Sequence, residues 1–163
     1  YFARKYDPMR RGIVSHSYFL DPNNVSDLAG FDFVFLCVDK GAIRAMLVTF
    51  LVDNDIPFVD TGMNLQLVAE TNTLIGTCRA TLVTKDKSDH VSDYIPMDPD
   101  DDDVLYRQNI QVADMNAINA MLAVIKWKQH QGFYGDDFNP YNLSFGVNLM
   151  SLNRGPRYQC ETE

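Results

Sequence analysis

The sequence predicts an α/β fold, and three segments carry that prediction. Residues 31–38, FDFVFLCV, are apolar apart from Asp32, too short to span a bilayer, and rich in aromatic and β-branched residues, which is typical of a fully buried strand. Apolar residues then recur at intervals of three and four over residues 42–54 and again over residues 110–129, which is the period of one helix face. A strand with two amphipathic helices indicates a sheet with helices packed on it.

Composition bounds the class of protein. The 163 residues are enough for one core, so we expect a single domain over residues 1–163. A formal net charge of -8 argues against a nucleic-acid surface, which needs a basic patch, and no apolar run is long enough for a membrane span. Cys37, Cys78 and Cys160 are too few and too widely spaced for a disulfide framework, which favours a cytoplasmic setting, and Cys78 falls inside an expected strand, where burial is the default.

The first 30 residues predict three short elements. Residues 1–9 read as the end of a helix, because a proline follows Asp7 and pushes it out of helical conformation. Residues 13–19 alternate in polarity and predict a strand, with His16 as an ordinary residue on a sheet face. Residues 25–29 follow turn-forming residues and predict one short helix.

A hairpin is expected after the helix over residues 42–54. Residues 58–60 predict a strand that ends at Gly62 and its preceding threonine. Residues 65–69 and 73–84 predict two further strands around a Thr-Asn turn, with Gly76 as a candidate bulge.

The remaining chain predicts a polar interval, a long helix and one last strand. Residues 85–107 include MDPDDDD, whose spacing does not match a calcium loop and which we interpret as a solvated loop. The helix over residues 110–129 ends at Gly132, and its Lys126 is expected in a solvated helix end. Residues 141–152 alternate and predict a strand. The apolar stripe expected on the helix consists of Ile110, Ala113, Ala117, Ile118, Met121, Leu122 and Ile125.

Asp39 is the acidic residue whose position is most suggestive of chemistry. It stands where the strand over residues 31–38 ends and the next helix begins. Ligands of open α/β sheets bind beyond the carboxyl ends of the strands, so a carboxylate there is well placed for catalysis or binding. The alternative is that Asp39 caps the helix, which aspartate does well on its own.

Three blocks of sequence resemble the ThiF or E1-like family, the adenylating enzymes that activate ubiquitin-like and sulfur-carrier proteins. They are CVDKGAIR over residues 37–44, IPFVDTG over residues 56–62, and the long helix with its flanks over residues 109–132. The resemblance implies a Rossmann-like, mostly parallel sheet with antiparallel strands added to it. The family's glycine-rich loop and phosphate-binding lysine are not found, so we expect this chain to be the C-terminal part of such a domain.

The resemblance also implies a function and its residues. The full-length protein is expected to use ATP and Mg²⁺ to adenylate the C-terminal carboxylate of a ubiquitin-like or sulfur-carrier protein, and to pair as a homodimer. By resemblance Asp39 is the catalytic magnesium ligand, and Asp39, Lys40 and Arg44 bind the nucleotide. Zinc, which some relatives hold with two Cys-x-x-Cys pairs, has no such ligands here, and residues 85–107 contain no cysteine for a thioester.

Other interpretations remain open at this point. Arg44 could instead be structural and tie the start of its helix to a neighbouring loop. The chain could be a non-catalytic dimerisation or protein-docking module, since Met115, Met121, Val124 and Trp127 extend beyond the main stripe of the long helix. A nicotinamide or flavin oxidoreductase would need the glycine fingerprint that this sequence lacks.

Overall fold

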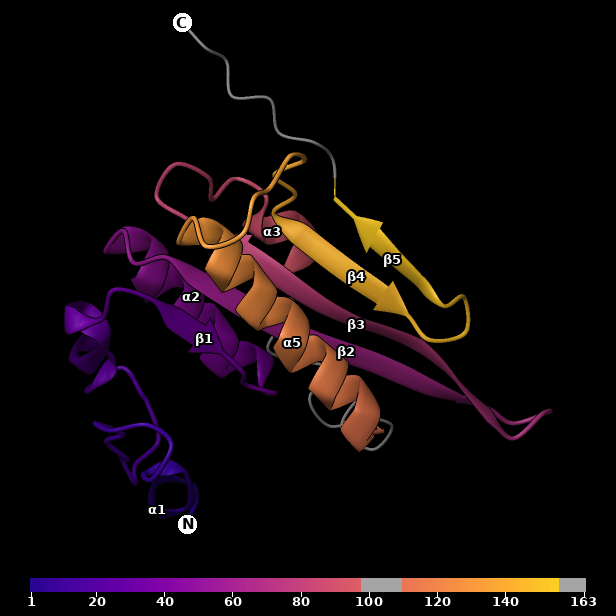
Figure 1. Ribbon diagram of the computed structural model, residues 1–163, viewed down its shortest axis with the longest axis horizontal. Coiled ribbons are helices and arrows are strands. Elements are labelled where there is room, and N and C mark those ends of the chain that lie inside the picture. Colours follow the sequence, from indigo (N-terminus) through magenta and orange to yellow (C-terminus); the bar gives the residue numbers. More distant parts are fainter. Residues whose placement is uncertain (98–109, 156–163) are drawn as a thin grey trace, which may run out of the picture.

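The strands of the described residues, 1–97 and 110–155 of this computed structural model, form one five-stranded sheet in the order β1-β2-β3-β4-β5 (Figure 1). Their bounds are β1 Val34–Leu36, β2 Phe58–Val68, β3 Thr73–Val83, β4 Asn142–Gly146 and β5 Ser151–Arg154. β1 and β2 pair in parallel, and the other three neighbouring pairs are antiparallel. The α/β class is confirmed, but the expectation of a mostly parallel sheet is wrong for this part of the chain, because tight turns join β2 to β3 and β4 to β5 and such connections pair strands antiparallel.

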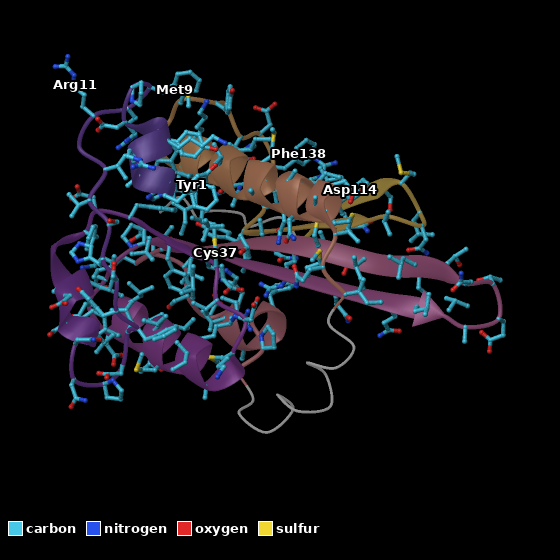
Figure 2. All side chains as sticks on the ribbon, turned by 90° about the horizontal axis from the view of Figure 1, so that it is seen from below. Tyr1, Met9, Arg11, Cys37, Asp114 and Phe138 are labelled. Atoms are coloured by element: carbon cyan, nitrogen blue, oxygen red, sulfur yellow. The ribbon has the colours of Figure 1, made fainter. Side chains whose placement is uncertain are left out.

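Helices cover both faces of this sheet. The helices of the described residues are α1 Phe2–Tyr6, the 3₁₀ helix η1 Val25–Gly30, α2 Gly41–Asp53, α3 Val91–Tyr94 and α5 Ala113–His130. Figure 2 shows α5 on one side of the sheet and α2 on the other. The core accordingly has two parts. Leu36, Phe58 and Val83 pack with α2, whereas Val59, Cys78, Ala80 and Leu143 pack with α5.

β1 is shorter and less buried than the sequence indicates. Its side chains are half-buried, exposed and buried in turn, and Phe35 is 43% exposed. Within the described residues β1 lies at the edge of the sheet and pairs with β2 alone, so one flank of the strand faces outward. Full burial was therefore the wrong expectation for residues 31–38, although the strand itself and the helix that follows are confirmed.

The N-terminal segment contains a helix but not the expected strand. Residues 1–9 include α1, and η1 lies where a short helix was expected. Residues 13–19 lie in irregular backbone with exposed side chains up to Phe19, and His16 stacks edge-on against Tyr18 rather than on a sheet. Alternation alone does not make a strand, because a strand needs a neighbour to accept its backbone hydrogen bonds.

β2 runs without interruption past the residues expected to end it. Gly62 pairs with Arg79 and Leu65 with Gly76, so the register between β2 and β3 continues through both glycines. The expected break at Gly62 is wrong because β3 supplies a partner along the whole strand. Gly76 has a φ of +141° but keeps its register, so it is a local change of backbone conformation and not a bulge.

The expected last strand is a hairpin. β4 ends at Gly146, and a four-residue turn over residues 147–150 leads into β5, which pairs antiparallel with β4. Met150 takes a left-handed conformation with a φ of +48°. The turn carries valine, leucine and methionine, so the alternating pattern conceals it.

α5 is confirmed as the long helix, but it buries a different face from the expected one. Its buried residues are Met115, Asn119, Leu122, Ala123 and Lys126. Of the expected stripe, Ala113, Ala117, Met121 and Ile125 are exposed. Lys126 is 1% exposed and not part of a solvated helix end, because its ammonium pairs with Asp136. The buried face includes the polar residues Asn119 and Lys126, which an apolar period does not identify.

The C-terminus of α5 ends as the sequence predicts. Gly132 has a φ of +70°, and its N–H donates to the Gln129 carbonyl at 2.9 Å. The N–H of Phe133 donates to the Lys128 carbonyl at 2.8 Å, which completes the paired hydrogen bonds of a Schellman motif. The glycine is required there because other residues rarely take this conformation.

Two further expectations concern the aspartate run and the absence of a membrane span. The aspartate run over residues 98–103 lies outside them, so its interpretation as a solvated loop stays a prediction. Among the helices of the described part, none combines the length and apolar content needed to cross a bilayer.

Candidate functional site at the end of β1

Asp39 and Lys40 lie on the surface in the connection from β1 to α2. Both side chains are exposed, as is Cys37 just before them. α2 begins at Gly41 with Lys40 as its N-cap residue, in extended conformation and with no side-chain capping bond. Asp39 therefore precedes the cap position, and the N-cap alternative does not describe the observed helix start. Its carboxylate is presented to solvent beyond the carboxyl end of a parallel strand.

Arg44 lies one turn into α2 and points inward. Its side chain is 9% exposed, and its Nε donates to Asp60 Oδ1 at 3.1 Å. Its Nη2 donates to the backbone carbonyl of Val38. In the described residues Arg44 thus makes its ion pair with Asp60 and not with Asp39. This arrangement fits the structural alternative for Arg44, in which it ties the start of α2 to a neighbouring segment.

Asp60 is the centre of a buried polar network. The residue is 0% exposed, and its second oxygen accepts from Arg79 Nη2 at 2.7 Å. Arg79 Nη1 donates to Thr81 Oγ1 at 2.7 Å, and the Thr81 hydroxyl donates to Asn142 Oδ1 at 2.8 Å. The network therefore reaches from α2 through β2 and β3 to β4.

Burial and charge act on Asp60 in opposite directions. Burial raises the pKa of its carboxyl above the ordinary value, because the charged form loses its hydration. The guanidinium groups of Arg79 and Arg44 act the other way and favour the carboxylate. Both carboxylate oxygens have a guanidinium donor, so the group is fully hydrogen-bonded in its ionised form.

Two contacts fix the backbone next to this network. Thr61 Oγ1 donates to the carbonyl of Leu36, the last residue of β1, at 3.2 Å. Asn119 of α5 donates from Nδ2 to the Gly62 carbonyl at 3.1 Å. Gly62 is close to Arg79, since a Cβ at Gly62 would stand 2.6 Å from Arg79 Nη2. The absence of a side chain at Gly62 leaves room for the guanidinium that binds Asp60.

Sequence reasoning missed the buried network that Asp60 forms with Arg79 and Arg44. Asp60 and Arg79 were each placed only within a predicted strand, over residues 58–60 and 73–84. A signal was available, because Asp60 follows two apolar residues, Phe58 and Val59, of a core strand, and a charged group in such a position is retained only when it is paired. Its partners come from segments that are distant in sequence, so pattern reading could have indicated a buried acid but not what binds it.

The donor set at the end of β1 suits magnesium better than a softer metal. No three His, Cys, Asp or Glu side chains come together as a metal-binding group within residues 1–97 and 110–155. Magnesium commonly takes one or two protein carboxylates beside phosphates and water, and the exposed Asp39 carboxylate meets that requirement. Asp60 does not, because both of its oxygens already accept from guanidinium groups.

Comparison with known proteins adds no family to this picture. No protein-family model matches the chain, and no curated protein matches its sequence.

Proposed function

We propose that this chain is the later part of a ThiF or E1-like domain, and that the full-length protein adenylates the C-terminal carboxylate of a ubiquitin-like or sulfur-carrier protein with ATP. One observation carries the proposal: an exposed carboxylate, Asp39, stands beyond the carboxyl end of β1 in the parallel β1-α2-β2 unit. Crevices at that edge of α/β sheets are where ligands bind. The resemblance of residues 37–44 and 56–62 to the family gives the position its chemistry.

Adenylation of a carboxylate requires charge compensation at this position. A carboxylate attacks the α-phosphorus of ATP and expels pyrophosphate, so two anions have to approach each other. Magnesium, when bound, offsets this repulsion and stabilises the developing charge on the phosphate oxygens. Asp39 would hold the ion through its carboxylate, and the exposed Lys40 beside it would attract the nucleotide's phosphates. Arg44 contributes by binding Asp60 and the Val38 carbonyl.

Replacing Asp39 with Asn in the full-length protein tests the assignment. The amide keeps the shape but removes the charge, and since Asp39 is exposed we expect thermal stability to change little. ATP-pyrophosphate exchange should fall by orders of magnitude. Asp53→Asn is the matched control, because Asp53 is an exposed aspartate at the other end of α2. Exchange that stays near normal in Asp39→Asn would refute the catalytic role.

The chain on its own should be inactive. Because the glycine-rich loop and phosphate-binding lysine of the family are not found in the 163 residues, we expect weak or undetectable binding of magnesium-ATP. Isothermal titration calorimetry of the isolated chain measures this directly, and tight binding would contradict the assignment of the chain to the later part of the domain.

A second candidate function is a non-catalytic dimerisation or docking module of the same fold. The observation that favours it is the outer face of α5, where Met121 is 68% exposed, Val124 41% and Ile125 40%. Phe35 of β1 is also exposed, and its ring lies 6.1 Å from that of Trp127. Apolar side chains gathered in this way commonly mark an interface. The Asp39→Asn experiment separates the two candidates, because a docking module has no exchange activity to lose.

A further inference from the structure

The connection that carries Asp39 is held by its backbone at two alternate residues. Thr61 Oγ1 donates to the carbonyl of Leu36, and Arg44 Nη2 donates to the carbonyl of Val38. Leu36 is buried and Val38 packs against the core beside α2. The residues between and after them, Cys37 and Asp39, have exposed side chains. The inward contacts at 36 and 38 therefore determine that residues 37 and 39 face outward.

The second of these contacts depends on Asp60. Arg44 reaches Val38 with Nη2 while its Nε is bound to Asp60 Oδ1 at 3.1 Å. One guanidinium thus bridges a buried carboxylate and a backbone carbonyl, and its planar shape fixes the angle between the two contacts. A lysine keeps the charge but presents it as a single point at the end of a flexible chain, so it would not reproduce the bridge.

Asp60 in turn is held from the opposite side. Arg79 Nη2 binds Asp60 Oδ2 at 2.7 Å, and Arg79 is anchored through Thr81 to Asn142 of β4. Arg79 and Arg44 therefore bind the same carboxylate with the same charge, and their side chains are 16% and 9% exposed. The difference that matters is that the contacts of Arg79 lead toward β3 and β4 and those of Arg44 lead toward Val38.

We propose that Arg44 and Asp60 are positioning residues for Asp39: the Asp60 carboxylate orients the Arg44 guanidinium, which holds the Val38 carbonyl and thereby fixes the direction of the Asp39 side chain. The role of Asp39 as magnesium ligand rests on the function proposed above, but the clamp on Val38 does not. Arg79 supports the carboxylate without touching the connection, so the two arginines make a matched pair for the test.

Cys37 provides a probe that is independent of catalysis. It is exposed and adjacent to Val38, whereas Cys78 is buried, so a nitroxide attached in a Cys160→Ser background reports on Cys37. In the electron paramagnetic resonance spectrum of this nitroxide, we expect Arg44→Lys and Asp60→Asn to convert the immobilised component to a mobile one. We expect Arg79→Lys to give the same spectrum as the parent chain. An unchanged spectrum in Arg44→Lys, or an equal change in Arg79→Lys, would overturn the proposal.

A measurement on the unaltered chain covers the case in which a variant does not fold. A clamped Arg44 guanidinium should rotate slowly about its Nε–Cζ bond and give separate resonances for its two Nη groups in NMR spectra. Averaged Nη resonances for Arg44 would overturn the proposal without any substitution.

The full-length protein then links the clamp to magnesium. Arg44→Lys should raise the magnesium concentration for half-maximal ATP-pyrophosphate exchange and lower the rate by about a hundredfold, the loss that a displacement of about 1 Å produces. Arg79→Lys should leave the magnesium concentration for half-maximal exchange unchanged, even where its loss of thermal stability equals that of Arg44→Lys. An increase of the same size in both variants would mean that Arg44 has a purely structural role, and the proposal would be overturned. If Cys37 and Arg44 behave as expected but the parent protein has no exchange activity, the clamp stands and the proposed function fails.

Discussion

The buried ion pair between α5 and the following loop predicts how much stability is lost when its acidic partner is neutralised. Lys126 is 1% exposed, and its Nζ lies 2.9 Å from Asp136 Oδ2. The other oxygen of Asp136 accepts from the N–H of Asn139 at 2.8 Å. Asp136→Asn retains that acceptor but leaves the ammonium of Lys126 buried without a counter-charge. A buried charge that loses its partner costs about 3–5 kcal/mol, which for a chain of this size lowers the melting temperature by roughly 6–20 °C.

A double variant tests whether this cost comes from the buried ammonium of Lys126 that has lost its counter-charge. Lys126→Met combined with Asp136→Asn removes both charges and keeps an unbranched chain of similar length in the core. Replacing a buried ion pair by apolar groups is often neutral, so we expect the double variant to regain most of the stability that Asp136→Asn loses. Urea unfolding followed by circular dichroism measures all three chains. A double variant no more stable than Asp136→Asn would refute the reasoning.

The pKa of Lys126 predicts how its contribution to stability changes with pH. Burial lowers the pKa of Lys126 below its ordinary value, while Asp136 acts in the opposite direction. Between that lowered pKa and the ordinary one near 10.4, the unfolded chain binds more protons at this residue than the folded chain, so stability rises with pH. The stability of the parent relative to Lys126→Met should therefore increase as the pH rises toward about 10.4. A relative stability that falls or stays constant in this range would be inconsistent with a lowered pKa.

Three further predictions concern the sheet, the outer helix face and the cysteines. Gly76→Ala should destabilise the chain strongly, because φ is +141° and the new Cβ would stand 2.1 Å from the Asn64 carbonyl oxygen; Gly135→Ala, with nothing within 4 Å, should be close to neutral in thermal unfolding. Light scattering should give twice the 18.6 kDa mass and Met121→Asp should halve it, whereas Met150→Asp, at a methionine that is 78% exposed against 68% for Met121, should not; a monomeric parent would remove the dimer prediction. In a Cys160→Ser background a thiol reagent should modify Cys37 and spare Cys78, whose pKa is raised by burial, and equal reactivity of the two would contradict the burial of Cys78.

The sequence was most informative where local and tertiary signals agree. In α2 the apolar period, the preceding strand and the short connection all indicate the same unit, and the structure contains β1, α2 and β2 in that order. Asp39 lies in the connection that follows β1, although the strand ends at Leu36 and not at residue 38, and its chemistry is a proposal. The end of α5 was also predicted correctly, because Gly132 takes the positive φ that favours glycine.

The errors share a different cause, which is that a single strand pattern does not show its neighbours. Residues 13–19 and 141–152 both alternate, yet the first has irregular backbone and the second is divided by a turn. Gly62 lies inside β2 because β3 pairs across it. Strands are completed by hydrogen bonds to residues that are far away in sequence, so their limits depend on pairing as much as on propensity.

The rotation of α5 shows why the apolar count alone identified the wrong face. The observed buried face includes the polar residues Asn119 and Lys126, whereas Met121 and Ile125 are exposed. In the observed orientation Asn119 binds the Gly62 carbonyl and Lys126 binds Asp136, and rotating the helix would break both contacts. A rotated helix would also move Met115 and Ala123 away from the core that they form with Val59, Cys78 and Ala80. Apolar packing and these polar contacts together favour the observed face, and the apolar residues left outside become the surface on which the dimer prediction depends.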